Sequence, residues 1–167
     1  MREPWRLWQD LDSYEEINLS EDTMLFSHDG IHDSQTHLAS PSYFYEQLRS
    51  EISLATRTDK PIALIKILFD NPDSDQVRAH DILHFSYELT QLTRQEDCIG
   101  RLGVNEVVII VRDGRGNAEL FVNRLLQATS LTVNHTLKIR VATVFAHNNE
   151  NSLKLLDRLD RAELIAR

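Results

Sequence analysis

The chain has 167 residues, of which 41% are hydrophobic and 26% charged, a composition typical of a soluble globular domain with an extension. The net charge of −8 argues against general nucleic-acid binding, which depends on neutralising phosphates and releasing their counterions. The single cysteine, Cys98, allows no intrachain disulfide, and no segment approaches the roughly 20 apolar residues of a membrane span. Because residues 1–16 also lack the apolar core of a secretory signal, we expect a cytoplasmic protein without membrane insertion.

Residues 1–32 differ in composition from the rest of the chain. They combine Trp5 and Trp8 with many acidic residues and with a turn-forming cluster at 28–30. We expect an N-terminal extension that forms a helix or two, or that serves as a docking segment. The two tryptophans either cover part of the domain's own core or bind a partner, and the sequence leaves both alternatives open.

From residue 33 onward the apolar pattern is regular and predicts the order α-β-α-β-β-α-β-α. Apolar residues at helical spacing predict helices over 42–57, 75–94, 117–129 and 152–167. Short apolar runs predict strands over 62–69, 98–102, 106–111 and 137–145. Residues 103–105 join the second and third strands as a hairpin. The order predicts an α+β fold, with helices packed on a mostly antiparallel sheet as in a ferredoxin-like palm.

Five fragments between Asp33 and Arg167 resemble the motifs of one known family. Asp33, Thr36, Leu38 and Phe44 stand at the matching positions of D-x-L-T-G-L-x-N-R-R-x-F, and Pro61 precedes an apolar strand at 62–68. Ile82, Phe85, Ser86 and Leu89 take the positions of L-x-x-[apolar]-A-x-x-L. Arg94, Asp97, Gly103 and Glu106 match R-x-x-D-x5-G-G-[DE]-E-F, and Asp160, Ala162 and Ala166 match A-D-x-A-L-Y-x-A-K at 159–167. They are similar to the motifs of the GGDEF domain, the catalytic domain of bacterial diguanylate cyclases. The resemblance implies that residues 33–167 form a GGDEF-like, nucleotidyl-cyclase-type palm.

The resemblance also implies where magnesium would bind in an active relative. One metal ligand is the first aspartate of D-x-D after the first strand, and this position is Leu68, which has no ligating atom. The second ligand is the third signature residue, here Asn105, which keeps a carbonyl oxygen but no negative charge. Glu106 is the acid that persists in the signature. Asp70 shares a strand face with residue 68, so a slipped register would let it substitute for Leu68, and that alternative stays open.

Two further positions depart from the family pattern. Val104 replaces the second signature glycine, and a β-branched residue disfavours the positive φ that tight hairpins often need. Ala79 stands where the family has a guanine-contacting aspartate, and Asp81 lies two residues away on another part of the helix. We therefore predict a degenerate domain with no catalytic residues, no magnesium and no cyclase activity.

A second site of the family is better preserved. Arg94 and Asp97 reproduce its R-x-x-D product-inhibition motif, in which the arginine lies nine residues before the first signature glycine, here Gly103. The family often has a further arginine on the following helix, and Arg124 lies within about one residue of that position. A guanidinium can bind a phosphate or the O6/N7 edge of guanine, and a carboxylate can accept from N1–H and N2–H. The resemblance implies cyclic di-GMP as a regulatory ligand, with a ligand-bridged dimer as one arrangement. The alternative is that Arg94 and Asp97 are only a helix-end ion pair.

Two functions from different classes follow from these features. The first is a cyclic di-GMP receptor and signalling effector that uses Arg94, Asp97 and Arg124. The second is a protein-interaction scaffold without a nucleotide ligand, in which the N-terminal segment or the altered catalytic face docks a partner.

Overall fold

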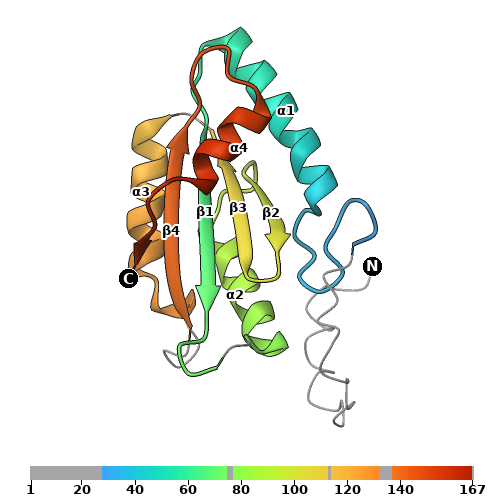
Figure 1. The fold of residues 1–167 in the computed structure, drawn as a ribbon, viewed down its shortest axis with the longest axis vertical. Helices are drawn as coiled ribbons and strands as arrows, with labels where there is room; N and C mark the ends of the chain where they lie inside the picture. Colours follow the sequence, from blue (N-terminus) through green and yellow to red (C-terminus); the bar gives the residue numbers. More distant parts are fainter. Residues whose placement is uncertain (1–27, 75–76, 113, 132–136, 167) are drawn as a thin grey trace.

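The computed structural model describes residues 28–74, 77–112, 114–131 and 137–166, so Trp5 and Trp8 lie outside the described residues. The elements in chain order are α1 (Pro41–Thr58), β1 (Ala63–Asp70), α2 (Ala79–Leu92), β2 (Cys98–Gly103), β3 (Glu106–Val111), α3 (Arg115–Gln127), the 3-10 turn η2 (Thr129–Leu131), β4 (Lys138–Phe145), α4 (Ser152–Asp160) and β5 (Ile165–Ala166). The strands form one antiparallel sheet in the order β2-β3-β1-β4-β5. The predicted α+β fold is confirmed (Figure 1).

The sheet lies between two layers of helices. In the view of Figure 1, α1 and α4 lie in front of the sheet, and α2 and α3 lie behind it. Alternate residues of β1 face the two layers, as the pleat of a strand requires. Odd-numbered residues such as Ile65 and Ile67 join the cluster under α2 and α3, whereas Leu64 joins the cluster under α1 and α4.

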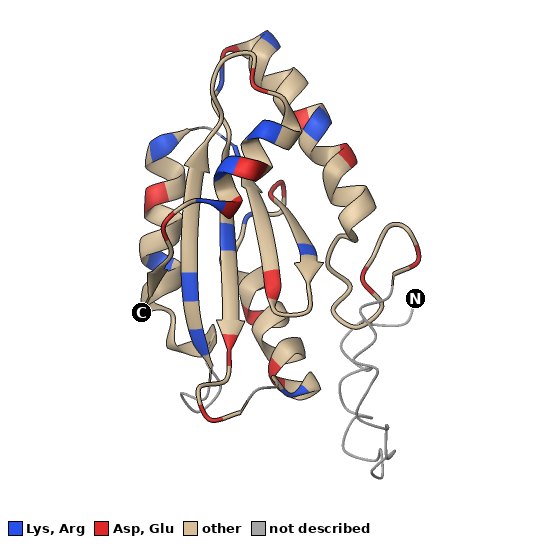
Figure 2. Ribbon diagram, in the orientation of Figure 1, with Lys and Arg blue, Asp and Glu red and all other residues tan. Residues whose placement is uncertain are grey.

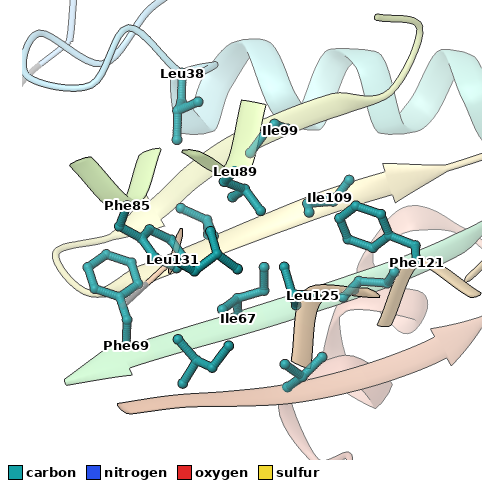
Figure 3. Packing of buried hydrophobic residues seen from close by; sticks show 14 of the residues in the cluster. Leu38, Ile67, Phe69, Phe85, Leu89, Ile99, Ile109, Phe121, Leu125 and Leu131 are labelled. Carbon is teal, nitrogen blue, oxygen red and sulfur yellow. The ribbon is translucent and has the colours of Figure 1, made fainter. Parts of the chain in front are cut away.

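Most of the hydrophobic core lies under α2 and α3. Figure 3 shows residues from the sheet and from both helices meeting there, among them Ile67, Ile109 and Leu125. The rings of Phe69 and Phe85 stack with their centroids 4.4 Å apart, which fixes α2 against the end of β1. This packing holds the ends of β1 and α2 in fixed positions, and the candidate site residues lie at or near these ends.

Two of the predicted helices have other boundaries in the structure than the sequence predicted. The second helix begins at Ala79, four residues later than expected, and ends at Leu92, so Arg94 lies in the loop that follows it. The last helix ends at Asp160 rather than at Arg167, and Ile165 and Ala166 pair with β4 instead. The apolar spacing was misleading because Leu164 packs against the core from non-helical chain. None of the helices in the described part of the chain combines the length and apolarity of a membrane span.

The signature hairpin also differs from expectation in one respect. Val104 and Asn105 form a two-residue turn between Gly103 and Glu106, which are paired. Among the described residues, positive φ is found at Gly30, His37, Asp59, Gly114 and Asn149. This turn therefore does not need the positive φ that a β-branched residue disfavours, and Val104 is compatible with it. The side chain of Val104 is 43% exposed and needs no space in the core.

Candidate functional site

The face of the sheet under α1 and α4 carries the positions that would bind metal in a cyclase. Leu68 of β1 is paired with Glu106 of β3 on one side and with Arg140 of β4 on the other. Directly opposed residues on antiparallel strands are close neighbours on one face. The row across the three strands therefore reads acid, leucine, base, and the leucine stands at its centre.

A buried lysine lies next to this row. Lys66 is 8% exposed, and its Nζ lies 2.8 Å from Oδ1 of Asp160, at the end of α4, and 3.8 Å from Oε2 of Glu106. Burial raises the pKa of Glu106, and the nearby ammonium of Lys66 opposes this shift only in part. The acid that survives from the signature is thus already paired with a cation.

Asp70 shares this face, as the strand pattern predicted, but it too has a partner. Nη2 of Arg140 donates a hydrogen bond to Oδ2 of Asp70 across 3.2 Å. A slipped register that used Asp70 as a metal ligand would have to break this pair. The contact therefore counts against the alternative in which Asp70 takes the place of Leu68.

Asn105, at the tip of the hairpin, is held by its backbone. The N–H of Phe69 donates to its carbonyl oxygen across 3.1 Å. Its side-chain Oδ1 is buried and has no hydrogen-bond partner among the described residues. One neutral oxygen is a weak ligand for magnesium, which prefers anionic oxygens.

These side chains do not fit a magnesium site. Leu68 offers no donor atom, and the nearby acids Asp70 and Glu106 are paired with Arg140 and Lys66. Within the described ranges, no cluster of three or more His, Cys, Asp or Glu side chains could hold a metal. The arrangement on this face is an ion-pair network rather than a pair of open carboxylates.

The position expected to contact guanine is equally unsuited to that task. Ala79 is the exposed first residue of α2 and carries no polar side chain. Asp81 is 3% exposed, and one of its carboxylate oxygens lies 3.5 Å from Nε of Arg78. Asp81 is thus buried and paired with Arg78, so its carboxylate is not presented to a ligand in the way that an exposed side chain would be.

Arg94 and Asp97 lie in the loop between α2 and β2. The two residues are joined through the backbone, because the Asp97 N–H donates to the Arg94 carbonyl across 3.1 Å and the Arg94 N–H lies 3.4 Å from Oδ2 of Asp97. The exposed Arg94 guanidinium instead lies 3.5 Å from Oδ1 of Asn117 on α3. Burial raises the pKa of Asp97. The nearby charge of Arg94 acts against this rise, as it would in the helix-end pair that the sequence left as an alternative.

Arg124 reaches the same crossing of α2 and α3 from the other direction. Its Nη2 donates to the carbonyl oxygen of Leu92 across 3.0 Å, and its guanidinium carbon lies 5.5 Å from the ring centroid of Phe121. Arg124 thus binds the C-terminal end of α2, while Arg94, two residues after Leu92, reaches back to α3. Both arginines therefore make contacts between the end of α2 and α3, Arg94 to Asn117 and Arg124 to Leu92.

A cleft of about 530 Å³ opens beside Arg94 and Asp97. Its walls come from the loop before α1, the first turns of α1, the end of α2 and the start of β2. The polar or aromatic side chains that line it are His32, His37, Tyr43, Gln47, Thr90, Thr93, Arg94, Gln95, Glu96 and Asp97. This volume is in the range of small-molecule sites, and Tyr43 offers an aromatic surface that is 38% exposed.

Sequence reasoning missed several of these residues. Lys66 could have been found, because a lysine inside an apolar strand of a buried sheet requires an anionic partner. Its partner Asp160 could not have been found in the same way, since 94 positions separate the two residues. The cleft is likewise a result of tertiary packing that the sequence does not show. The 32–39 loop packs against β2, and this brings His32, His37 and Tyr43 to the cleft.

The comparison with solved structures identifies the fold as that of a GGDEF domain. A microbial GGDEF domain described for its interaction with cyclic di-GMP has a TM-score of 0.68 and 20% identity, over 78% of this chain and 86% of that chain. The GGDEF domain of DgcB from Caulobacter crescentus, in complex with c-di-GMP, has a TM-score of 0.69 and 14% identity, over 81% and 88% of the two chains.

A third similar structure includes a protein partner. The diguanylate cyclase SiaD of Pseudomonas aeruginosa, in complex with its activator SiaC, has a TM-score of 0.67 and 18% identity, over 94% of this chain and 61% of that chain. No protein-family model matches the sequence, and neither does any curated protein. At these identities the likeness establishes the fold, and the predicted GGDEF-like fold is confirmed.

Proposed function

We propose that this protein is a catalytically inactive member of the GGDEF family that acts as a cyclic di-GMP receptor. The ligand would bind in the cleft that Arg94 and Asp97 line, and Arg124, which contacts the end of α2 at Leu92, would be the third residue of the site. The observation that carries the proposal is the contrast between the two sites. An exposed arginine and a half-buried carboxylate line an open cleft, whereas the metal-site acids are paired with Lys66 and Arg140.

The chemistry of the cleft suits a guanine nucleotide with phosphodiester groups. Within the described part of the chain, the exposed Arg94 guanidinium makes a long contact of 3.5 Å with Asn117, and it can rotate from there toward a phosphate or a guanine edge. Asp97 can accept from the guanine N1–H and N2–H groups, and Tyr43 can stack on a base. Two of the structurally similar GGDEF domains are themselves described with cyclic di-GMP, which supports this choice of ligand.

The first expectation is that the purified protein makes no cyclic di-GMP from GTP and magnesium. Losing metal ligands removes several kcal/mol of transition-state stabilisation, and the guanine-contacting aspartate is missing as well. Product would be measured by liquid chromatography with mass detection, beside an active cyclase as a positive control. Clear synthesis by the wild-type chain would refute the proposed inactivity.

The second expectation is that cyclic di-GMP binds and that Arg94→Ala weakens the binding about tenfold or more. A charge-assisted hydrogen bond contributes about 1.5–3 kcal/mol, which corresponds to a factor of roughly 10 to 100 in Kd. Isothermal titration calorimetry would measure Kd for the wild type and the variant. Arg57→Ala is the matched control, because Arg57 is an exposed arginine in the last turn of α1 and does not line the cleft.

The same titration separates the receptor from the scaffold. A wild-type protein that gives no heat and no chemical-shift change at high ligand concentration would contradict the receptor role and favour a protein-interaction scaffold. If cyclic di-GMP binds, the oligomeric state with and without it would show whether the ligand bridges two copies. Both the receptor and the scaffold would act by binding a protein partner in a bacterial signalling pathway.

A further inference from the structure

Lys66 is a basic residue inside the otherwise apolar segment 62–69. A buried ammonium is stable only where anionic or carbonyl oxygens replace the water that it loses. In this structure it is shared by two carboxylates that come from elements far apart in sequence, Glu106 at the start of β3 and Asp160 at the end of α4. The residue therefore binds α4 and the signature strand to the centre of the sheet.

The charges on this face are arranged as local pairs. Figure 2 shows basic bands on β1 and β4 beside acidic bands on β3 and at the end of β1. Lys66 faces Glu106 and Asp160, and Arg140 faces Asp70. The two cations flank Leu68 from within β1 and from β4, so the position that would supply a metal ligand lies between two bases.

We propose that Lys66 is a resident counter-cation. Its ammonium neutralises Glu106 and Asp160, and thus has the electrostatic role that a divalent cation would have on this face in the cyclases that the chain resembles. A metal ion entering beside Glu106 would meet a like charge, and displacing the ammonium would leave a buried cation unpaired. Lys66 is thus a positioning residue that holds Glu106 and the end of α4 in place and excludes magnesium.

This role rests on the proposed absence of cyclase chemistry and adds a cause to it. If the missing carboxylates at positions 68 and 105 were the whole cause, two substitutions that restore them would restore magnesium binding. With Lys66 in place, restoring both carboxylates is not sufficient, because the site already holds its positive charge. The test is therefore to restore the carboxylates with and without the ammonium.

The experiment measures magnesium binding to the full chain by isothermal titration calorimetry. The Leu68→Asp/Asn105→Asp double variant is expected to bind magnesium weakly. Adding Lys66→Met, which keeps an unbranched stem and removes the charge, is expected to tighten binding by about tenfold or more. Adding Lys154→Met instead is the matched control, because Lys154 is an exposed lysine of α4, and it should leave Kd at the value of the double variant.

Equal magnesium affinity of the double variant with and without Lys66→Met would overturn the counter-cation role. If Lys66→Met prevents folding, Glu106→Gln and Asp160→Asn are added to remove the carboxylates left unpaired. Recovery of a cooperative thermal transition then supports the role, and a chain that stays unfolded overturns it. Cyclic di-GMP synthesis by the wild type would refute the proposed inactivity and the exclusion of magnesium together, whereas equal magnesium affinity refutes the role of Lys66 alone, so the two failures are distinguishable.

Discussion

Replacing Arg101 with alanine is expected to lower the free energy of unfolding by about 3–5 kcal/mol, the range found when one partner of a buried ion pair is removed. Arg101 is 1% exposed and Asp33 is fully buried, and Nη1 of Arg101 donates to Oδ2 of Asp33 across 3.0 Å. The substitution would leave the buried carboxylate without its cation. Chemical denaturation followed by circular dichroism measures the change.

The expected loss is large because Arg101 makes hydrogen bonds to two segments of the chain. Its two terminal nitrogens also donate to Oε1 of Gln35 and to the carbonyl oxygen of Val104, across 2.8 and 3.0 Å. One side chain therefore connects the loop before α1 to the signature hairpin. The same loop forms a wall of the cleft beside Arg94, so this network also determines the shape of the proposed ligand site.

Asp33 is ionised in this network at neutral pH. Burial acts to raise its pKa, but hydrogen bonds from Thr36 and Arg101 outweigh burial, and the pKa lies below its usual value. A lowered folded-state pKa stabilises the protein above the unfolded-state pKa, and this contribution is lost as the pH falls through the folded-state value. Denaturation at neutral pH therefore reports the full effect of the pair.

Two controls make the Arg101 result specific. Arg57→Ala removes an exposed arginine and should change the free energy of unfolding by no more than about 0.5 kcal/mol. The Asp33→Asn/Arg101→Met double variant removes both charges and should recover part of the loss, since no unpaired charge remains. An Arg101→Ala protein as stable as the Arg57→Ala control would show that the buried pair does not hold these segments together.

Replacing Gly100 with alanine is expected to destabilise the protein by about 1–3 kcal/mol or more through overpacking. A Cβ on Gly100 would lie 2.4 Å from Cδ2 of Phe44, and 2.6 and 2.8 Å from its Cγ and Cβ. Phe44 is fully buried on α1, and atoms this close to its backbone cannot move without moving the helix. The expected loss would appear in thermal and chemical denaturation.

Gly116→Ala is the matched control for that experiment. An added Cβ at Gly116 meets nothing within 4 Å, and the residue lies in the first turn of α3. At such a compatible position the substitution should be neutral or stabilising by about 0.4–1 kcal/mol, because alanine restricts the unfolded chain. If both variants had the same stability, α1 would not be packed against β2 as closely as the structure shows.

The sequence alone determined the strands and the chemical identity of the altered positions. The runs at 62–69 and 106–111 are apolar apart from Lys66 and Glu106, which is typical of strands in a buried sheet, and with 98–102 they form β1, β3 and β2. It also determined that neither residue 68 nor residue 105 carries a charge, because that depends on residue type and not on geometry.

Only the tertiary structure decided what these residues contact. Sheet register places Leu68 between Glu106 and Arg140, and helix packing brings Asp160 to Lys66 across 94 positions of sequence. Periodicity reports which side of an element is apolar, but not which distant side chain will oppose it. The R-x-x-D motif was therefore visible in the sequence, while the cleft beside it and the paired charges on the sheet face under α4 were not.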